Sequence, residues 1–122
     1  METKVFISQP MRNKSKNYID RERRLILDIL PSISGEDNLL EIPMIGDLAM
    51  STNKPAACLG MSIQDLSNAD LVAFAPGWRD ARGCVVEHAV CMLYNIPYIE
   101  LANDGNGYFI AKDGRGGITV NA

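Results

Sequence analysis

Glu87 follows a loop whose side chains could hold an anion. Residues 77–83 contain two glycines, two arginines, a tryptophan and an aspartate, and they separate an apolar stretch from a helical one. In α/β proteins such a loop lies at the carboxyl end of a strand, where ligands bind. The N–H groups and partial positive charge at the start of the following helix suit a phosphate. The Glu87 carboxylate can therefore reach a bound ligand; the alternative is a glutamate that complements the helix dipole.

Basic side chains on two loops could bind the same anion. The planar guanidinium groups of Arg79 and Arg82 suit a phosphate better than a point charge does, and their alternative is surface solvation. Arg12 and Lys14 follow a second loop, residues 8–11, and could face the same phosphate. The other basic residues of this region are expected on the solvated face of a helix: Arg21, Arg23 and Arg24.

Cys84, His88 and Cys91 form a stripe along one predicted helix. Such ligands suit zinc, but structural zinc takes four ligands and the chain has no Cys-x-x-Cys pair. A buried cysteine is most often a small apolar side chain, and a Cys–His nucleophile pair is the alternative. We therefore expect no metal site and no cofactor. His88, the only histidine, is expected to lie near Glu87 and to tune it.

Length and composition indicate one domain that spans residues 1–122. The chain is 47% hydrophobic and 22% charged, enough to form a core without disulfides or metal. Its net charge of −3 argues against a general nucleic-acid binder, and no apolar run approaches the ~20 residues of a membrane span. Residues 5–7 are too short an apolar run for a signal peptide. The three cysteines follow no disulfide spacing, which predicts reduced thiols in a cytoplasmic protein.

The spacing of apolar residues predicts alternating strands and helices. Residues 71–75 are apolar throughout, which is typical of a parallel strand buried on both faces. Pro31 and Gly35 are expected to end the first helix. The alternation predicts an α/β fold, a doubly wound parallel sheet of the Rossmann or flavodoxin type. The strands are expected at residues 4–8, 39–42, 71–75 and 97–101, and the helices at 16–30, 55–67 and 82–94.

The C-terminal part departs from this alternation. Residues 107–111 and 117–120 flank the glycine-rich stretch 112–116, which predicts a β-hairpin. An exposed strand edge invites pairing with another chain, so the hairpin is a candidate dimer element; the alternative is an extension of the same sheet. A second subunit would also help to close the shallow cleft of so small a domain. We therefore expect a homodimer or a higher homo-oligomer.

Several segments together resemble the nucleoside 2-deoxyribosyltransferase-like superfamily, above all its small bacterial and phage members. They are Val-Phe-Ile-Ser-Gln-Pro-Met at residues 5–11, Ala-Asp-Leu-Val-Ala at 69–73, the loop 77–83 with Glu87-His88-Ala89, and Ile-Pro-Tyr-Ile at 96–99. The resemblance covers residues 4–101. It implies the fold predicted above and an enzyme that acts on a nucleoside or nucleotide.

The resemblance also implies roles for individual residues. Glu87 would be the nucleophile that attacks the anomeric carbon and releases the base; a base or water then resolves the glycosyl ester. Ser62 stands where active members carry a second carboxylate, and Asp65, three residues later, could replace it with a shift in register. The two loops would hold the sugar and its 5′-substituent, which gives the contacts Ser8, Gln9, Pro10, Met11, Arg79, Asp80, Arg82 and Gly83.

Three more residues have two interpretations each. Trp78 could stack on a base or pack on the edge of the core. Asp80 could accept a hydrogen bond from a ribose hydroxyl or pair with a neighbouring arginine. Asp70, at the start of a strand, is either a catalytic carboxylate or the partner of a backbone N–H.

The sequence leaves three functions open. The first is a hydrolase or transferase of N-glycosidic bonds, and the second, favoured by Ser62, is a protein that binds a nucleotide without turnover. The third, a flavodoxin-like redox or regulatory module, ranks last because no flavin phosphate loop is recognisable. The expected partner is a small nucleoside or nucleotide, with neither a nucleic acid nor a membrane.

Overall fold

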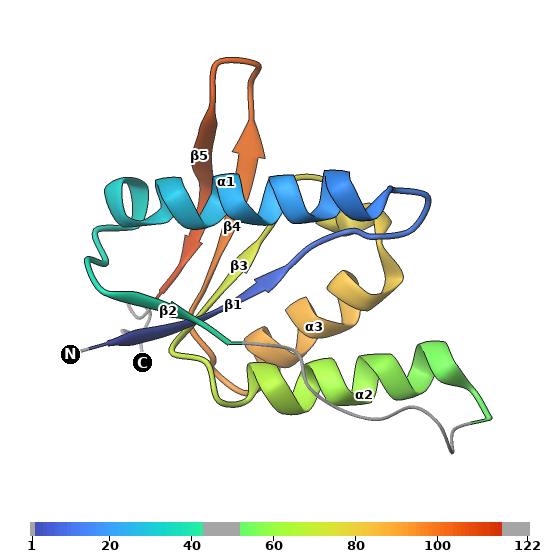
Figure 1. The fold of residues 1–122 in the computed structure, drawn as a ribbon. Helices are drawn as coiled ribbons and strands as arrows, with labels where there is room; N and C mark the ends of the chain where they lie inside the picture. The colour runs from blue at the N-terminus through green and yellow to red at the C-terminus, as the bar shows by residue number, and fades with distance from the viewer. Residues whose placement is uncertain (1, 43–51, 116–122) are drawn as a thin grey trace.

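The computed structural model describes residues 2–42 and 52–115 as a five-stranded sheet flanked by helices (Figure 1). The strand order is β2-β1-β3-β4-β5, and all neighbours are parallel except β4 and β5. The fold is therefore α/β and Rossmann-like, which confirms the predicted fold class. The elements are β1 (Thr3–Ser8), α1 (Lys16–Ser34), β2 (Leu39–Glu41), α2 (Lys54–Leu66), β3 (Leu71–Phe74), the 3₁₀ helix η1 (Trp78–Asp80), α3 (Arg82–Leu93), β4 (Tyr98–Asn103) and β5 (Tyr108–Gly114).

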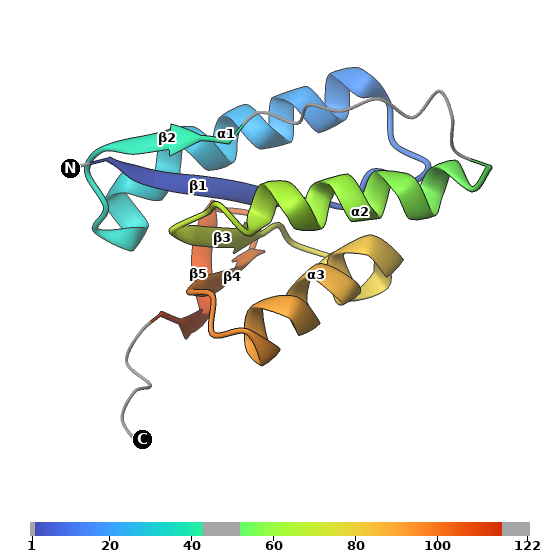
Figure 2. The same cartoon turned by 90° about the horizontal axis from the view of Figure 1, so that it is seen from below.

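The central strand β3 is buried on both faces, as its apolar run predicts. α1 covers one face of the sheet, and α2 and α3 cover the other (Figures 1 and 2). Leu71 and Ala73 join the core cluster beneath α1, whereas Val72 and Phe74 join the cluster beneath α2 and α3. No helix in the two described ranges combines the length and apolar character needed to cross a membrane.

α1 continues past Pro31, where the sequence predicts its end. Proline removes one backbone donor, but the last turn is anchored by other contacts. The Ser34 hydroxyl donates to the Leu30 carbonyl at 2.6 Å, and Ile33 packs against the core. Gly35, at φ +79°, then ends the helix and donates its N–H to the Pro31 carbonyl. Packing of this turn thus outweighs the helix-breaking tendency of proline.

The C-terminal hairpin differs from the predicted one. β5 pairs antiparallel with β4, and the turn between them lies at residues 104–107, where Gly105 and Gly107 have positive φ. Residues 112–114, predicted as the turn, are strand, and the predicted strand at 117–120 lies outside the described residues. The correction has a simple cause, since β4 has a free edge whose backbone groups β5 satisfies. β5 therefore extends the edge of the same sheet.

The winding of the chain reverses between β1 and β3. From β1 the chain passes through α1 to β2 on one side, and then through α2 to β3 on the other side of β1. At such a switch point the connections after two neighbouring strands diverge and leave a crevice at their carboxyl ends. The two connections here are residues 9–15 and 75–81.

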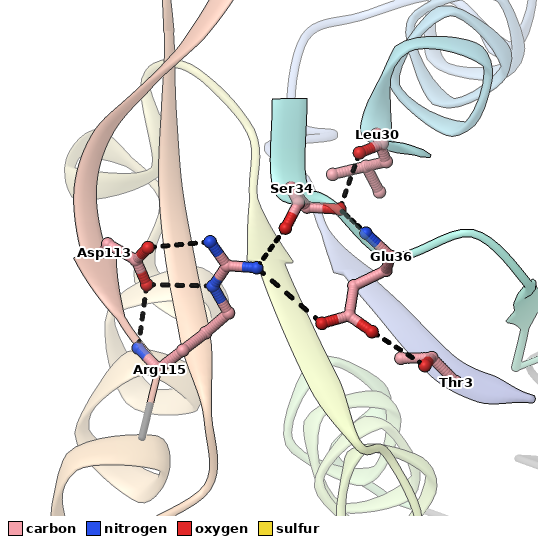
Figure 3. Close-up of polar contacts among 6 residues, drawn as sticks. All are labelled: Thr3, Leu30, Ser34, Glu36, Asp113 and Arg115. Atoms are coloured by element: carbon pink, nitrogen blue, oxygen red, sulfur yellow. Dashed lines mark hydrogen bonds and ion pairs between the residues drawn. The ribbon is translucent and has the colours of Figure 1, made fainter. Parts of the chain in front are cut away.

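Arg115 ties the end of β5 to the C-terminal end of α1 (Figure 3). Its guanidinium lies 2.7 Å from Asp113 and 3.7 Å from Glu36, and it donates to the Ser34 carbonyl. The Thr3 hydroxyl of β1 donates to Glu36 at 3.0 Å, so the network joins β1, α1 and β5. The hydrogen bond from Arg115 holds the pKa of Asp113 below its ordinary value.

Replacement of Arg115 by alanine is expected to lower the free energy of unfolding by roughly 1 kcal/mol, the scale of a partly exposed ion-pair network. Lys112→Ala, an exposed position on the same strand, is the matched control and should have little effect. Because folding lowers the pKa of Asp113, the stabilisation is present above the ordinary aspartate pKa and is lost as the pH falls through the folded value. Urea unfolding at neutral and acid pH measures this; equal effects of the two variants would contradict the network.

Candidate functional site

A cleft of about 910 Å³ opens at the switch point. It is bordered by residues 6–12 and 14, by residues 55, 58, 59 and 62 of α2, and by residues 77 and 79–87. The structure thus brings together the two predicted ligand loops and the predicted nucleophile. The predicted site residues that line the cleft are Ser8, Gln9, Pro10, Met11, Arg79, Asp80, Arg82, Gly83 and Glu87.

Gly77 gives the second loop a backbone conformation that favours glycine. Its φ of +85° is strained for any residue with a side chain, whereas a Cβ at this position would make only an ordinary contact, 3.9 Å from Cγ of Pro10. The chain then forms η1 and enters α3 after Ala81, which provides no side-chain cap. The N–H groups of the first turn of α3 therefore have no intrahelical partner, and Arg82 and Gly83 of this turn border the cleft.

Glu87 is a buried carboxylate in the wall of the cleft, with only 6% of the residue exposed. The Ser8 hydroxyl at the end of β1 donates to its Oε1 at 2.6 Å. The Ser62 hydroxyl of α2 lies close enough to act on its pKa. Burial raises the pKa of Glu87 above the ordinary glutamate value, and the two hydroxyl groups oppose this shift. An oriented and poorly hydrated carboxylate of this kind is suited to nucleophilic attack.

Ser62 is a site residue whose role the sequence did not reveal. The sequence marks it only as a hydroxyl at the position of an expected second carboxylate, whereas the structure makes it a partner of Glu87. It lies on the side of α2 that also brings Pro55, Cys58 and Leu59 to the cleft. Their spacing of three and four residues is the helical signal that could have identified this wall.

Among the charged side chains at the border of the cleft, basic ones outnumber acidic ones. Within residues 2–42 and 52–115, the side chains of Arg12, Arg82 and Asp80 form no hydrogen bond or ion pair, so they are available to a ligand. The pairing of Asp80 with a neighbouring arginine, one of its two interpretations, is therefore not seen among these residues. The charged residues that line the cleft are four basic ones, Arg12, Lys14, Arg79 and Arg82, and two acidic ones, Asp80 and Glu87.

Gln9 borders the cleft, but its amide is held by α1. Its Nε2 donates to the Ile19 carbonyl at 2.9 Å and to Glu22 at 3.0 Å, and its Oε1 accepts from Arg23 at 3.3 Å. Gln9 therefore fixes the first loop, and its amide is not free for a ligand. Arg23 also pairs with Glu41 at 3.0 Å, so its predicted place on a solvated face is wrong: it bridges α1 and β2.

His88 and Trp78, both candidate ligand contacts, do not line the cleft. Trp78 packs in the core cluster beneath α2 and α3, which agrees with the second of its two interpretations. Successive residues of a helix project about 100° apart, and His88 thus leaves α3 in a different direction from Glu87. Its ring stacks on Trp78 at 4.0 Å between centroids, and its Nε2 lies 2.8 Å from the buried carboxylate of Glu100. Arg79 donates to the same carboxylate at 3.3 Å and lies over the Trp78 ring. This cluster holds η1 against β4.

The other two predicted carboxylates also lie outside the cleft. Asp70 is at the amino end of β3, where its carboxylate accepts the N–H of Lys4 at 2.8 Å, and the cleft is at the carboxyl end. Its backbone-pairing interpretation is confirmed, and the structure does not bring its carboxylate to the cleft. Asp65 does not border the cleft either. The residue of α2 that lies beside Glu87 is Ser62.

All three cysteines are free thiols. Burial raises the pKa of Cys84 to about 11 and that of Cys91 to about 12, which keeps both protonated and makes them poor nucleophiles. Both pack in the core cluster beneath α2 and α3. Nowhere in the described part of the chain do three His, Cys, Asp or Glu side chains come together as a metal site.

Comparison with known proteins supports the fold and goes no further. No protein-family model and no curated protein matches the chain. The crystal structure of a conserved protein from Enterococcus faecalis V583 is similar, with a TM-score of 0.57 and 18% identity. The similarity covers 86% of this chain and 66% of the other. At this identity the likeness shows a common α/β architecture.

The stacked His88 is expected to hold the loop that carries the cleft's arginines. His88→Ala would leave a cavity beside Trp78 and remove one partner of the buried Glu100, which should cost about 2–4 kcal/mol of unfolding free energy. Trp78 is the only tryptophan, so its fluorescence reports this loop, and its emission should shift to longer wavelength as water reaches the ring. Gln64→Ala, at an exposed position of α2, is the control. Unchanged emission in folded His88→Ala would refute the anchoring role.

Glu87→Gln is expected to raise the melting temperature at neutral pH by a few degrees. Because the folded state raises the pKa of Glu87, the wild type loses stability as the pH rises from the unfolded to the folded pKa of this group. Glutamine has no charge to bury, so the variant avoids that loss, and the two proteins should melt alike below the ordinary glutamate pKa. Glu36→Gln, which weakens the ion pair with Arg115, should give no gain. Thermal unfolding across pH tests this, and a variant that melts below the wild type at neutral pH contradicts it.

Proposed function

We propose that the protein cleaves or transfers the N-glycosidic bond of a nucleoside 5′-phosphate, with Glu87 as the nucleophile. The observation that carries this proposal is the buried Glu87 carboxylate, which Ser8 and Ser62 hold in the wall of a cleft between two ligand loops. The resemblance of these loops to the nucleoside 2-deoxyribosyltransferase-like superfamily gives the carboxylate its reaction. The free thiols of Cys58, Cys84 and Cys91 accord with a reducing cytoplasm.

The reaction has two displacements at the anomeric carbon. A Glu87 oxygen attacks C1′, the new C–O bond forms as the C–N bond breaks, and the base leaves with the electron pair and takes a proton from water. Water or a second base then attacks C1′ and releases the glutamate. The hydrogen bond from Ser8 fixes the direction of the carboxylate, and limited hydration leaves less water to remove before attack.

The charge around the cleft supports a phosphorylated substrate. Arg12 and Arg82 have no partner in the described part of the chain and can turn toward a 5′-phosphate. The first turn of α3 adds free N–H groups at the same border. Asp80, which also lacks a partner there, can accept a hydrogen bond from a ribose hydroxyl.

A second function, nucleotide binding without turnover, is favoured by a separate observation. Asp80 is the other carboxylate that lines the cleft, and Ser62 offers Glu87 a hydroxyl at the position where the related enzymes carry an acid. A site of this kind lacks a second buried carboxylic acid to protonate a leaving base. Such a protein would sequester or sense a nucleotide.

The activity is tested by chromatography of free base released from a panel of nucleosides, nucleotides and dinucleotides. The wild type is expected to release base from a nucleoside 5′-phosphate, and Glu87→Gln to lower the rate by at least about 10³-fold while keeping ligand binding, since it removes the nucleophile and preserves the shape. Glu36→Gln, a glutamate remote from the cleft, is the control and should keep the wild-type rate.

The possible results separate the two functions. Undiminished base release by Glu87→Gln would remove this residue from the mechanism. A wild type that releases no base but melts at higher temperature with a nucleotide is the binding protein. A wild type that neither releases base nor is stabilised by any nucleoside or nucleotide rejects both functions.

A further inference from the structure

The cleft has positive charge at its exposed border and a carboxylate in its buried wall. The side chains of Arg12, Arg79 and Arg82 border the cleft and are exposed to water. Glu87, in contrast, is only 6% exposed. A ligand that complements both parts carries a negative group at one end, for the arginines, and a positive group at the other end, for the carboxylate.

Glu87 lacks a cationic partner within residues 2–42 and 52–115. It forms no ion pair with a lysine, arginine or histidine of these ranges. Burial and the hydroxyl groups of Ser8 and Ser62 act on its pKa, and no charged side chain is among the causes. A buried carboxylate is normally paired with a cation, because an unpaired buried charge is costly. The positive charge is thus left for a ligand to supply.

Among the described residues that line the cleft, none is suited to protonate a leaving base. Asp80 is exposed, and a carboxyl group in contact with water holds no proton at neutral pH. Burial raises the pKa of the Cys84 thiol to about 11, which makes it a weak acid. The Lys14 ammonium lies over the ring of Tyr18, and His88 does not line the cleft. A neutral base that receives no proton leaves as an anion, and therefore slowly.

We propose that the substrate of the cleft is a 5′-nucleotide whose base is a positively charged aromatic ring, a pyridinium or an N7-alkylated purine. This inference rests on the proposed function, because it names the substrate class of the same site. The phosphate lies at the border with Arg12 and Arg82, and the charged ring lies near Glu87. An oxygen poised to attack C1′ is about 3 Å from that carbon, so the ring nitrogen bonded to C1′ is within about 5 Å of the carboxylate.

A cationic base needs no proton in order to leave. As a Glu87 oxygen forms its bond with C1′, the bond from C1′ to the ring nitrogen breaks, and its electron pair stays on that nitrogen and neutralises the ring. Water then attacks C1′, gives its proton to the solvent and releases the glutamate. Before the reaction, the charge of the ring favours the ionised form of Glu87, which burial disfavours. The absence of an acid in the cleft is therefore compatible with turnover.

Binding is tested with an analogue that keeps its base, the carbocyclic form of nicotinamide mononucleotide, in which CH₂ replaces the ring oxygen of ribose. Its oxidised pyridinium ring is positively charged, whereas its reduced dihydropyridine ring has nearly the same shape and no charge. Titration calorimetry should show that the wild type binds the oxidised form at least about tenfold more tightly than the reduced form. Glu87→Gln should bind the two forms almost equally, because the glutamine has no charge.

Two matched variants locate the preference for the charged ring. Asp80→Asn neutralises the exposed carboxylate of the cleft, and Glu36→Gln neutralises one that is remote from it, so both should keep the ratio of the wild type. Circular dichroism shows whether each variant is folded. Equal affinity of the wild type for the two forms, a preference that survives Glu87→Gln, or a preference lost in Asp80→Asn would overturn the proposal.

Turnover separates a failure of this inference from a failure of the proposed function. Release of base is measured for 7-methyladenosine 5′-phosphate against adenosine 5′-phosphate, and for nicotinamide mononucleotide against its reduced form, after subtraction of the rate without enzyme. In at least one pair kcat/KM should be about 10²-fold higher for the charged member, and that pair identifies the ring. Equal rates within both pairs would overturn this inference and leave the proposed function standing. Release from none of the four compounds would reject both.

Discussion

The hydrogen bond from Ser8 to Glu87 joins residues 79 positions apart and is the contact around which the cleft is built. It depends on the parallel pairing of β1 with β3, which sets Ser8 beside Phe74, the last residue of the strand that leads into the loop and α3. The switch in winding direction leaves space above that pair. A change of register between the two strands would separate the hydroxyl from the carboxylate and turn each side chain to the other face.

The sides of helix α3 face three different environments. Glu87 faces the cleft, and its neighbour His88 faces the aromatic cluster with Trp78 and Glu100. The remaining side of the helix is exposed and carries apolar side chains, among them Val85, Met92 and Leu93. Because the helix has three acidic or basic side chains and two of them, Glu87 and His88, are buried, Arg82 is the only one that is exposed. The same helix thus positions the candidate nucleophile and leaves an apolar side exposed.

The sequence by itself determined the order of the elements and the place of the cleft. The continuous apolar run at 71–75 suffices to identify a buried parallel strand, since only a strand covered on both faces needs no polar side. Ligand loops must follow the carboxyl ends of parallel strands, so the positions of Ser8 and Glu87 along the chain predicted that both would border one cleft. These are local or topological properties, and no side-chain packing enters them.

Tertiary structure decided what local patterns leave open. The rotation of a helix about its axis decides which of its polar residues face the cleft, and packing sets that rotation. On α2, Ser62 rather than Asp65 lies beside Glu87. On α3, His88 is directed toward Glu100. α1 passes through Pro31 because its last turn has core contacts to make. Residues 112–114 form strand rather than turn because they pair with the free edge of β4. In each case tertiary contacts outweighed a local preference, and a sequence pattern does not contain their energies.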